Sequence, residues 1–100
     1  ISTEVPEGFS LGQNFPNPFN PVTNIGLRIA RFGYVSLKVF DITGKEIAVL
    51  VNENLNAGTY NVDFDASQLA SGTYFYRLVV GDNTNNGGSF TDVKKMIVVK

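Results

Sequence analysis

Carboxylates are the side chains of this 100-residue chain with the most versatile chemistry. The aspartates are Asp41, Asp63, Asp65, Asp82 and Asp92. Two carboxylates that meet can share acid and base roles in hydrolysis, and a larger group can bind calcium. The first of them, however, begins a turn, and the next two share one polar strand face, where carboxylates are usually solvated or bonded to nearby backbone. The pattern therefore favours local structural roles over catalysis.

One segment is similar to a calcium-binding loop. It runs from Gly81 to Gly88 and places Asp82 and Asn86 before Gly87. The position that carries a bidentate glutamate in an EF-hand is occupied by Val93, which argues against such a site. We therefore predict no metal site.

The composition removes most remaining chemistry. The chain has no cysteine, so it can form neither a disulfide nor a thiolate metal site, and it has no histidine, the usual general base near neutral pH. A net charge of -1 gives no reason to expect nucleic acid, and no apolar run approaches the ~20 residues of a membrane span. We expect a non-enzymatic globular protein without a cofactor.

Aromatic residues offer one binding hypothesis. Tyr60, Tyr74, Phe75 and Tyr76 would make a carbohydrate-stacking platform if their rings lay exposed on one sheet face. Their apolar neighbours favour core packing instead. We keep an accessory carbohydrate-binding module of a secreted hydrolase as an alternative hypothesis for the function, which exposed tyrosine rings would support.

Period-two alternation of apolar and polar residues dominates the chain and predicts short strands. Asp41–Gly44 fits a turn with aspartate first and glycine last, and 65–72 has room for one helical turn before Gly72. One predicted strand, 46–51, is apolar on both faces, so we expect it to be central or covered. The predicted strands are 25–29, 35–39, 46–51, 60–64, 73–80, 89–93 and 96–99.

About seven such strands without an amphipathic helix predict an all-β fold, an immunoglobulin-like antiparallel β-sandwich. A small closed barrel is the alternative. Residues 1–8 are polar and contain proline and glycine, so we expect a linker from an upstream domain there, with the domain itself at 9–100.

The phrase "QNFPNPFNP", Gln13 to Pro21, interrupts this pattern. Each residue before a proline is pushed out of the helical region, and the prolines cannot donate ladder hydrogen bonds. We expect an extended ribbon outside any central strand, an N-terminal clasp in which Phe15 and Phe19 are buried against the sandwich. At the other end of the chain, Lys94 and Lys95 are of the kind that protects an exposed strand from aggregation.

Four stretches in order carry a family resemblance: "FSLGQNFPNPFNPVTNIGLRI", "VSLKVFDITGKEI", "LNAGTYNVDFDASQLASGTYFYRLVV" and the terminal "KKMIVVK". Together they resemble the type A C-terminal sorting domain of the type IX (Por) secretion system, over Phe9 to Lys100. Two loop regions depart from the family pattern. The 81–88 loop is longer than usual, and "FDAS" stands where related immunoglobulin-like domains, including that of the flagellar hook-capping protein, often have a tryptophan-containing turn.

The resemblance implies a sorting signal at the end of a larger exported protein of Bacteroidetes-type bacteria. Such a signal is read by the outer-membrane translocon after passage through the periplasm, and a sortase-like peptidase commonly removes it, so that the cargo is secreted or held on the cell surface. The implied translocon-recognition residues are Gly72, Tyr74, Lys94, Lys95, Met96, Ile97, Val98, Val99 and Lys100. The implied domain-start motif comprises Gln13, Asn14, Pro16, Asn17, Pro18 and Pro21.

A final strand with free backbone groups can add to a receptor sheet, which would give affinity through main-chain hydrogen bonds. We expect this mode of recognition at the terminal strand, with Lys100 and the terminal carboxylate fixing its register.

Overall fold

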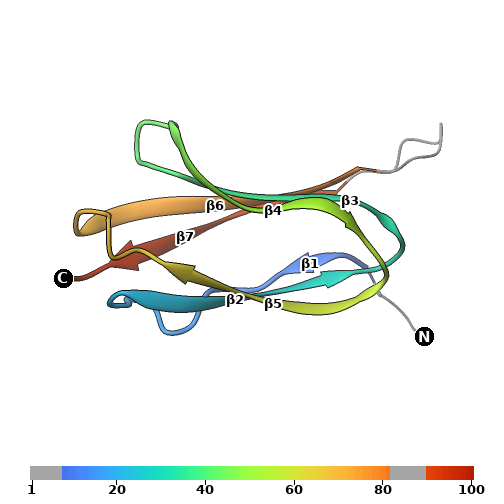
Figure 1. The fold of residues 1–100 in the computed structure, drawn as a ribbon, viewed down its shortest axis with the longest axis horizontal. Helices are drawn as coiled ribbons and strands as arrows, with labels where there is room; N and C mark the ends of the chain where they lie inside the picture. The colour runs from blue at the N-terminus through green and yellow to red at the C-terminus, as the bar shows by residue number, and fades with distance from the viewer. Residues whose placement is uncertain (1–7, 82–89) are drawn as a thin grey trace.

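The computed structural model describes residues 8–81 and 90–100, and the described part is built from β-strands (Figure 1). The sequence prediction of about seven strands is confirmed in number. The strands are β1 (Ser10–Leu11), β2 (Val22–Ile29), β3 (Gly33–Phe40), β4 (Glu46–Leu55), β5 (Gly58–Asp65), β6 (Gly72–Gly81) and β7 (Phe90–Val98).

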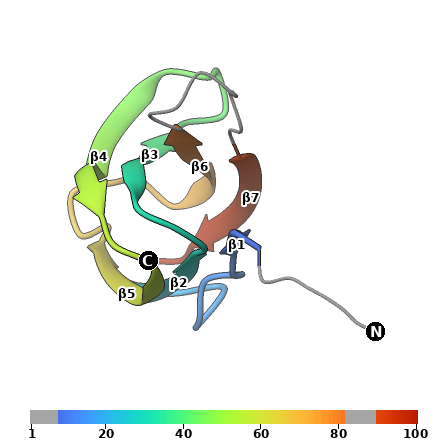
Figure 2. The ribbon, with the colours of Figure 1, turned by 90° about the vertical axis from the view of Figure 1, so that its right-hand side faces the viewer.

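The strands form two sheets that face each other (Figure 2). The smaller sheet has the order β1-β2-β5, and the larger has the order β4-β3-β6-β7. Every pairing between neighbouring strands is antiparallel. This arrangement confirms the predicted sandwich of immunoglobulin-like type and excludes the closed barrel, because each sheet keeps two edges.

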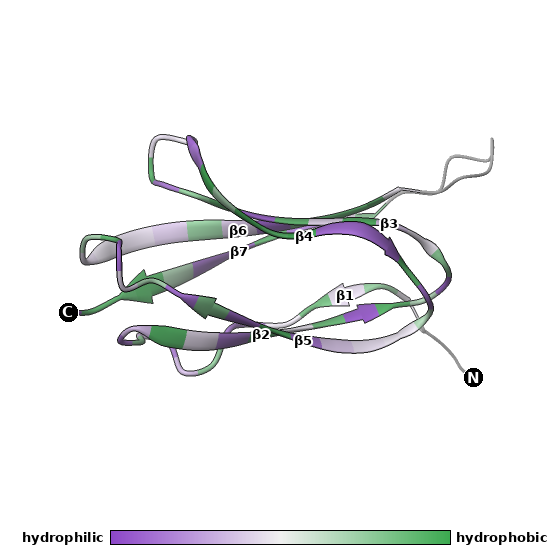
Figure 3. Ribbon diagram, viewed as in Figure 1, coloured by the Kyte–Doolittle hydropathy of each residue, from purple (hydrophilic) through white to green (hydrophobic). Residues whose placement is uncertain are grey.

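The core lies between the sheets because successive side chains of a strand point to opposite faces. In β3, for example, Val35, Leu37 and Val39 are fully buried, and the residues between them are not. Hydrophobic and hydrophilic positions accordingly alternate along several strands in Figure 3. Tyr76 and Leu78 of β6 complete the middle of the core.

The turn between β3 and β4 matches its prediction. The Gly44 amide donates to the Asp41 carbonyl oxygen at 2.9 Å, and Gly44 has a φ of 91°, which favours glycine. The Asp41 carboxylate accepts from the Thr43 hydroxyl and from the backbone amides of Thr43 and Lys45. These hydrogen bonds, the Thr43 hydroxyl first, lower the pKa of Asp41 below its ordinary value.

The expected helical turn after β5 is a β-turn instead. The Leu69 amide donates to the Ala66 carbonyl oxygen at 2.9 Å, a spacing of three residues. Asp65 accepts from the Ser67 amide at 2.8 Å, as an N-cap would, and this bond lowers the pKa of Asp65. The segment returns to strand at Gly72 before a second helical hydrogen bond forms.

The prediction that 46–51 is a central or covered strand is wrong, because β4 is an edge strand of the larger sheet and its Val49 is 46% exposed. Its pairing with β3 shifts register twice, so Ile47 and Leu50 each lie opposite no partner of their own. Such bulges turn neighbouring side chains to the same face, which makes a one-sided strand read as apolar on both sides. The later part of β4 is hydrophilic in Figure 3.

The two short strands predicted at 89–93 and 96–99 are one continuous strand, β7. Lys94 and Lys95 continue its alternation: Lys94 is half-buried on the inward side and Lys95 is exposed on the outward side. The lysine pair therefore lies inside the strand. The sequence analysis did not predict β1, because a strand of two residues is too short to show an alternation of apolar and polar side chains.

Candidate functional site

The two motifs implied by the resemblance are more than 70 residues apart in sequence and lie side by side in the fold. We call Gln13–Pro21 the opening strap; its peptide bonds before Pro16, Pro18 and Pro21 are cis. Phe19 forms a parallel bridge with Val98 of β7, with the Phe19 amide donating to the Ile97 carbonyl at 3.0 Å and the Val99 amide donating to the Phe19 carbonyl at 2.9 Å.

Side chains of the opening strap extend this contact along the outer edge of β7. The Asn17 side-chain oxygen accepts from the Ile97 amide at 2.9 Å, and the Gln13 side-chain amide donates to the Lys95 carbonyl at 2.7 Å. Further along the strand, the Val93 amide donates to the Asp92 carboxylate at 2.9 Å. The expectation that the terminal strand has free backbone groups is therefore wrong: β6 occupies one edge, and the strap closes the other at 95–99.

A buried polar network anchors the opening strap to the core. The Tyr76 hydroxyl accepts from the Asn14 amide and donates to the Gly12 carbonyl, both at 2.7 Å. The Asn14 side-chain amide donates to the Thr23 hydroxyl at 2.9 Å and to the Pro16 carbonyl at 3.1 Å. Asn14 and Thr23 are among the few buried polar residues. Burial raises the pKa of Tyr76 to about 12, so the phenol keeps its proton at physiological pH.

The clasp prediction holds for one phenylalanine of the strap and fails for the other. Phe19 is 2% exposed and packs edge-on against Phe64 with ring centroids 6.3 Å apart. Phe15 is 79% exposed, because its backbone bridges Asn24 and turns the ring away from the sandwich. The strap lies outside the named strands, as expected.

The implied recognition residues of the C-terminal motif point alternately into the core and toward the outward face of the larger sheet. Met96 and Val98 are buried in the core, Lys95 is exposed, and Ile97 is half-buried on the outward face. Lys94 makes a 3.8 Å ion pair with Asp92. Beyond the strand, the Lys100 amide donates to the Ser71 hydroxyl, and the Lys100 ammonium donates to the Ser67 carbonyl at 2.8 Å. Val99 is 47% exposed.

Gly72 and Tyr74 lie at the start of β6, next to this end of β7. Gly72 pairs with Val98 and has a φ of 153°, a conformation that side-chain-bearing residues rarely adopt. Tyr74 packs against the core, and its hydroxyl donates to the Ala70 carbonyl at 2.8 Å. The fold therefore brings both residues to the same end of the sandwich as the terminal motif.

The aromatic residues do not form the planar platform that carbohydrate stacking requires. Tyr76 is fully buried, and Tyr60 and Tyr74 pack against the core on their inward-facing sides. The Tyr60 hydroxyl donates to the Asn56 carbonyl at 2.7 Å. Phe75 lies on the opposite face of β6 from Tyr74 and Tyr76. The alternative function as a carbohydrate-binding module loses its structural basis.

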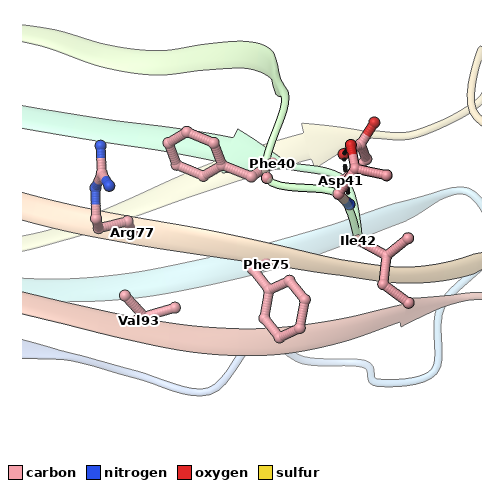
Figure 4. A pocket seen from close by; sticks show the side chains of 8 residues that line it. Phe40, Asp41, Ile42, Phe75, Arg77 and Val93 are labelled. Carbon is pink, nitrogen blue, oxygen red and sulfur yellow. Dashed lines mark hydrogen bonds between the residues drawn. The ribbon is translucent and has the colours of Figure 1, made fainter.

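An open groove of about 390 Å³ lies on the outward face of the larger sheet (Figure 4). Phe40 of β3, Phe75 and Arg77 of β6, and Val93 of β7 line it, together with Ile42 of the β3–β4 turn. The Arg77 guanidinium lies 4.6 Å from the Phe40 ring centroid, a cation–π contact. Sequence reasoning missed this groove, because its residues come from separate strands whose pairing the pattern does not specify.

The carboxylates of the described residues lie apart from one another. Asp63 is exposed and accepts from the Asn24 side-chain amide at 3.0 Å, and Asp41 and Asp65 hold local turns, as predicted. Within residues 8–81 and 90–100, no three carboxylates form a group able to hold a metal ion. Asp82 and the rest of the calcium-like loop through Gly88 lie outside the described residues. In that same described part, no helix is long and apolar enough to cross a membrane.

The fold and the joined motifs define a class: a small immunoglobulin-like sandwich in which an N-terminal strap closes the edge of the last strand. The sequence model of the secretion system C-terminal sorting domain matches residues 13–99. The chain belongs to this family. It is thus a non-catalytic C-terminal sorting domain of the type IX (Por) secretion system, a signal that directs cargo across the outer membrane and associates with the secretion machinery.

Two solved structures share the fold. The dimeric latent PorU from Porphyromonas gingivalis superposes with a TM-score of 0.69 at 22% identity, covering 99% of this chain and 10% of that one. CopC from Methylosinus trichosporium OB3b gives a TM-score of 0.54 at 20% identity, covering 90% of this chain and 92% of that one. The chain thus spans about a tenth of the length of PorU. No curated protein matches the chain.

Proposed function

We propose that the end of the sandwich built from β7, the opening strap and the start of β6 is the address that the type IX outer-membrane translocon reads. Gly72, Tyr74 and the terminal motif Lys94–Lys100 contribute to this address. The observation that carries the proposal is the joining of the family's first and last motifs through the Phe19–Val98 bridge. A surface that contains segments from both ends of the domain forms only when the whole domain is present and folded.

In this proposal the domain occupies 9–100 and residues 1–8 link it to an upstream cargo. A sortase-like peptidase removes the domain after translocation and leaves the cargo on the cell surface or in the medium. The address works through shape and side chains and needs no cofactor. The individual residue roles rest on the family resemblance together with their common location at one end of the fold.

A secretion assay tests the proposal. Residues 1–100 are fused behind a fluorescent protein that carries an ordinary export signal, and the fusion is expressed in a bacterium with a working type IX system. We expect fluorescence on the cell surface or in the medium, and its retention in the periplasm of a translocon mutant. Deletion of 95–100 should also retain it.

A matched variant separates recognition from folding. The deletion removes Val98 from the core, so it can act by unfolding the domain. Lys95→Glu changes an exposed side chain of the same motif and leaves the core intact. Secretion of the deletion variant at the wild-type level would overturn the role of the terminal motif, and periplasmic retention of the wild-type fusion would overturn the address function itself.

A further inference from the structure

The closed edge of β7 limits how a partner can contact this strand. Its main chain is paired with β6 on one side and covered by the opening strap on the other, through contacts at Lys95, Ile97 and Val99. Met96 and Val98 point into the core and are buried. Along 95–99 of the folded domain, a partner therefore contacts the terminal motif through its outward side chains rather than by strand addition.

Those outward side chains belong to a larger apolar face. Val93 is 50% exposed and lines the groove with Phe40 and Phe75. Lys95 lies opposite Phe75 in the pairing of β6 with β7, so the groove continues directly into the terminal motif. Figure 4 shows Phe40, Phe75 and Val93 arranged across neighbouring strands around this surface. Phe40 and Phe75 are half-buried and Val93 is half-exposed, so the three side chains form a shallow apolar floor on which a partner's apolar side chains can pack.

The charge on this face is positive where it is not already paired. Glu46 forms a 3.3 Å ion pair with Lys38, and the Asp41 carboxylate is occupied by its own turn. Neither Arg77 nor Lys95 has an ion-pair partner among residues 8–81 and 90–100. A partner that covers this face gains most by presenting carboxylates to these two cations.

We propose that the outward face of β3, β6 and β7 is a docking surface for a segment of the secretion machinery that carries apolar side chains flanked by carboxylates. Phe40, Phe75 and Val93 receive the apolar side chains, and Arg77 and Lys95 pair with the carboxylates. The proposal rests on the sorting function, and it specifies a face-on mode of recognition that leaves the opening strap in place.

The fluorescent fusion described above tests the surface with charge variants. Arg77→Glu should lower the secreted fluorescence by about tenfold or more, because like charges placed together across an interface are strongly unfavourable. Arg77→Lys keeps the charge and should retain most of the secretion. The matched control is Arg28→Glu, since Arg28 is an exposed arginine on the outward side of the smaller sheet.

The apolar part of the surface is tested independently. Val93→Asn should reduce secretion, and Val22→Asn should not, although Val22 is a strand valine of similar exposure at 43%. Thermal unfolding of each purified variant establishes that the sandwich is intact.

The outcomes separate the two proposals. If the wild-type fusion stays in the periplasm, the sorting proposal fails. If the wild-type fusion is secreted and Arg77→Glu and Val93→Asn are secreted equally well, the docking surface is wrong while the sorting function stands. Equal losses in the control variants on the smaller sheet would also overturn the docking surface, because the effect would then not depend on the face.

Discussion

Tyr76→Phe is the sharpest perturbation of the connection between the opening strap and the core. The substitution keeps the buried ring and removes only the hydroxyl, which accepts from the Asn14 amide and donates to the Gly12 carbonyl. Asn14 is 2% exposed, so its amide loses its partner without gaining water. Gly12 is exposed, and its carbonyl can bond to water instead.

The expected loss of stability follows from the different environments of the Asn14 amide, which is buried, and the Gly12 carbonyl, which is exposed. An unsatisfied buried donor costs about 1–3 kcal/mol, and the loss of an ordinary hydrogen bond costs about 0.5–1.5 kcal/mol. The free energy of unfolding should therefore fall by about 2–4 kcal/mol. For a domain of this size, each kcal/mol moves the melting temperature by roughly 4–8 °C, so Tyr76→Phe should lower it by about 10 °C or more.

Urea unfolding of the purified domain measures this change, and Tyr60→Phe is the matched control. The Tyr60 hydroxyl also donates to a carbonyl at 2.7 Å, but in an exposed setting, so the control should lose only about 0.5 kcal/mol. Amide hydrogen exchange at Ile97 should accelerate in Tyr76→Phe, because a loosened strap uncovers that amide. A loss for Tyr76→Phe no larger than for Tyr60→Phe would refute the anchoring role of the network.

Other predictions follow from the same region. Asn17→Ala removes the acceptor of the Ile97 amide and should speed hydrogen exchange at Ile97 while costing about 1 kcal/mol of stability in urea unfolding; unchanged exchange would contradict the capping role. Gly72→Ala should cost about 1–3 kcal/mol from backbone strain at a φ of 153°, measured by thermal unfolding, even though no atom lies within 4 Å of the added methyl group. Alkaline titration should destabilise the domain as the pH rises from about 10 to about 12, because the unfolded chain ionises its tyrosine while folded Tyr76 keeps its proton; Tyr76→Phe should remove this part of the pH dependence.

The alternation of side chains was sufficient to predict the sandwich and most of its strands from sequence. It failed where the backbone departs from simple alternation. In β4 the bulges at Ile47 and Leu50 mixed the two faces, and in β7 the polarity of Lys94 and Lys95 hid a continuous strand. Reasoning from period-two alternation assumes that each residue pairs with one residue of the neighbouring strand, which fails at the bulges of β4. It also assumes that each face of a strand is uniformly polar or apolar, which fails at the lysine pair of β7.

The contacts of the opening strap were beyond prediction for a different reason. Its prolines indicated an extended ribbon outside the sheets, and this is correct, but composition does not specify which strand the ribbon meets. The pairing depends on the Asn17 and Gln13 side chains reaching backbone groups 80 and 82 residues away. The resemblance indicated the family, whose model matches residues 13–99, but only the fold shows that the two ends of the chain are hydrogen-bonded to each other.

Under the proposed address function, this long-range pairing gives the two motifs a joint role at one end of the sandwich. The outer edge of β7 is closed by the opening strap only when Phe19 and Val98 are both present and the intervening strands have formed the core between them. A chain that lacks either end leaves an exposed strand edge, which is prone to pair with other chains. A complete and folded chain instead presents a closed edge beside the Phe75 and Arg77 face. In the proposed recognition mode, the same hydrogen bonds that suppress edge pairing at 95–99 leave the outward side chains of β7 as the surface that a partner can contact.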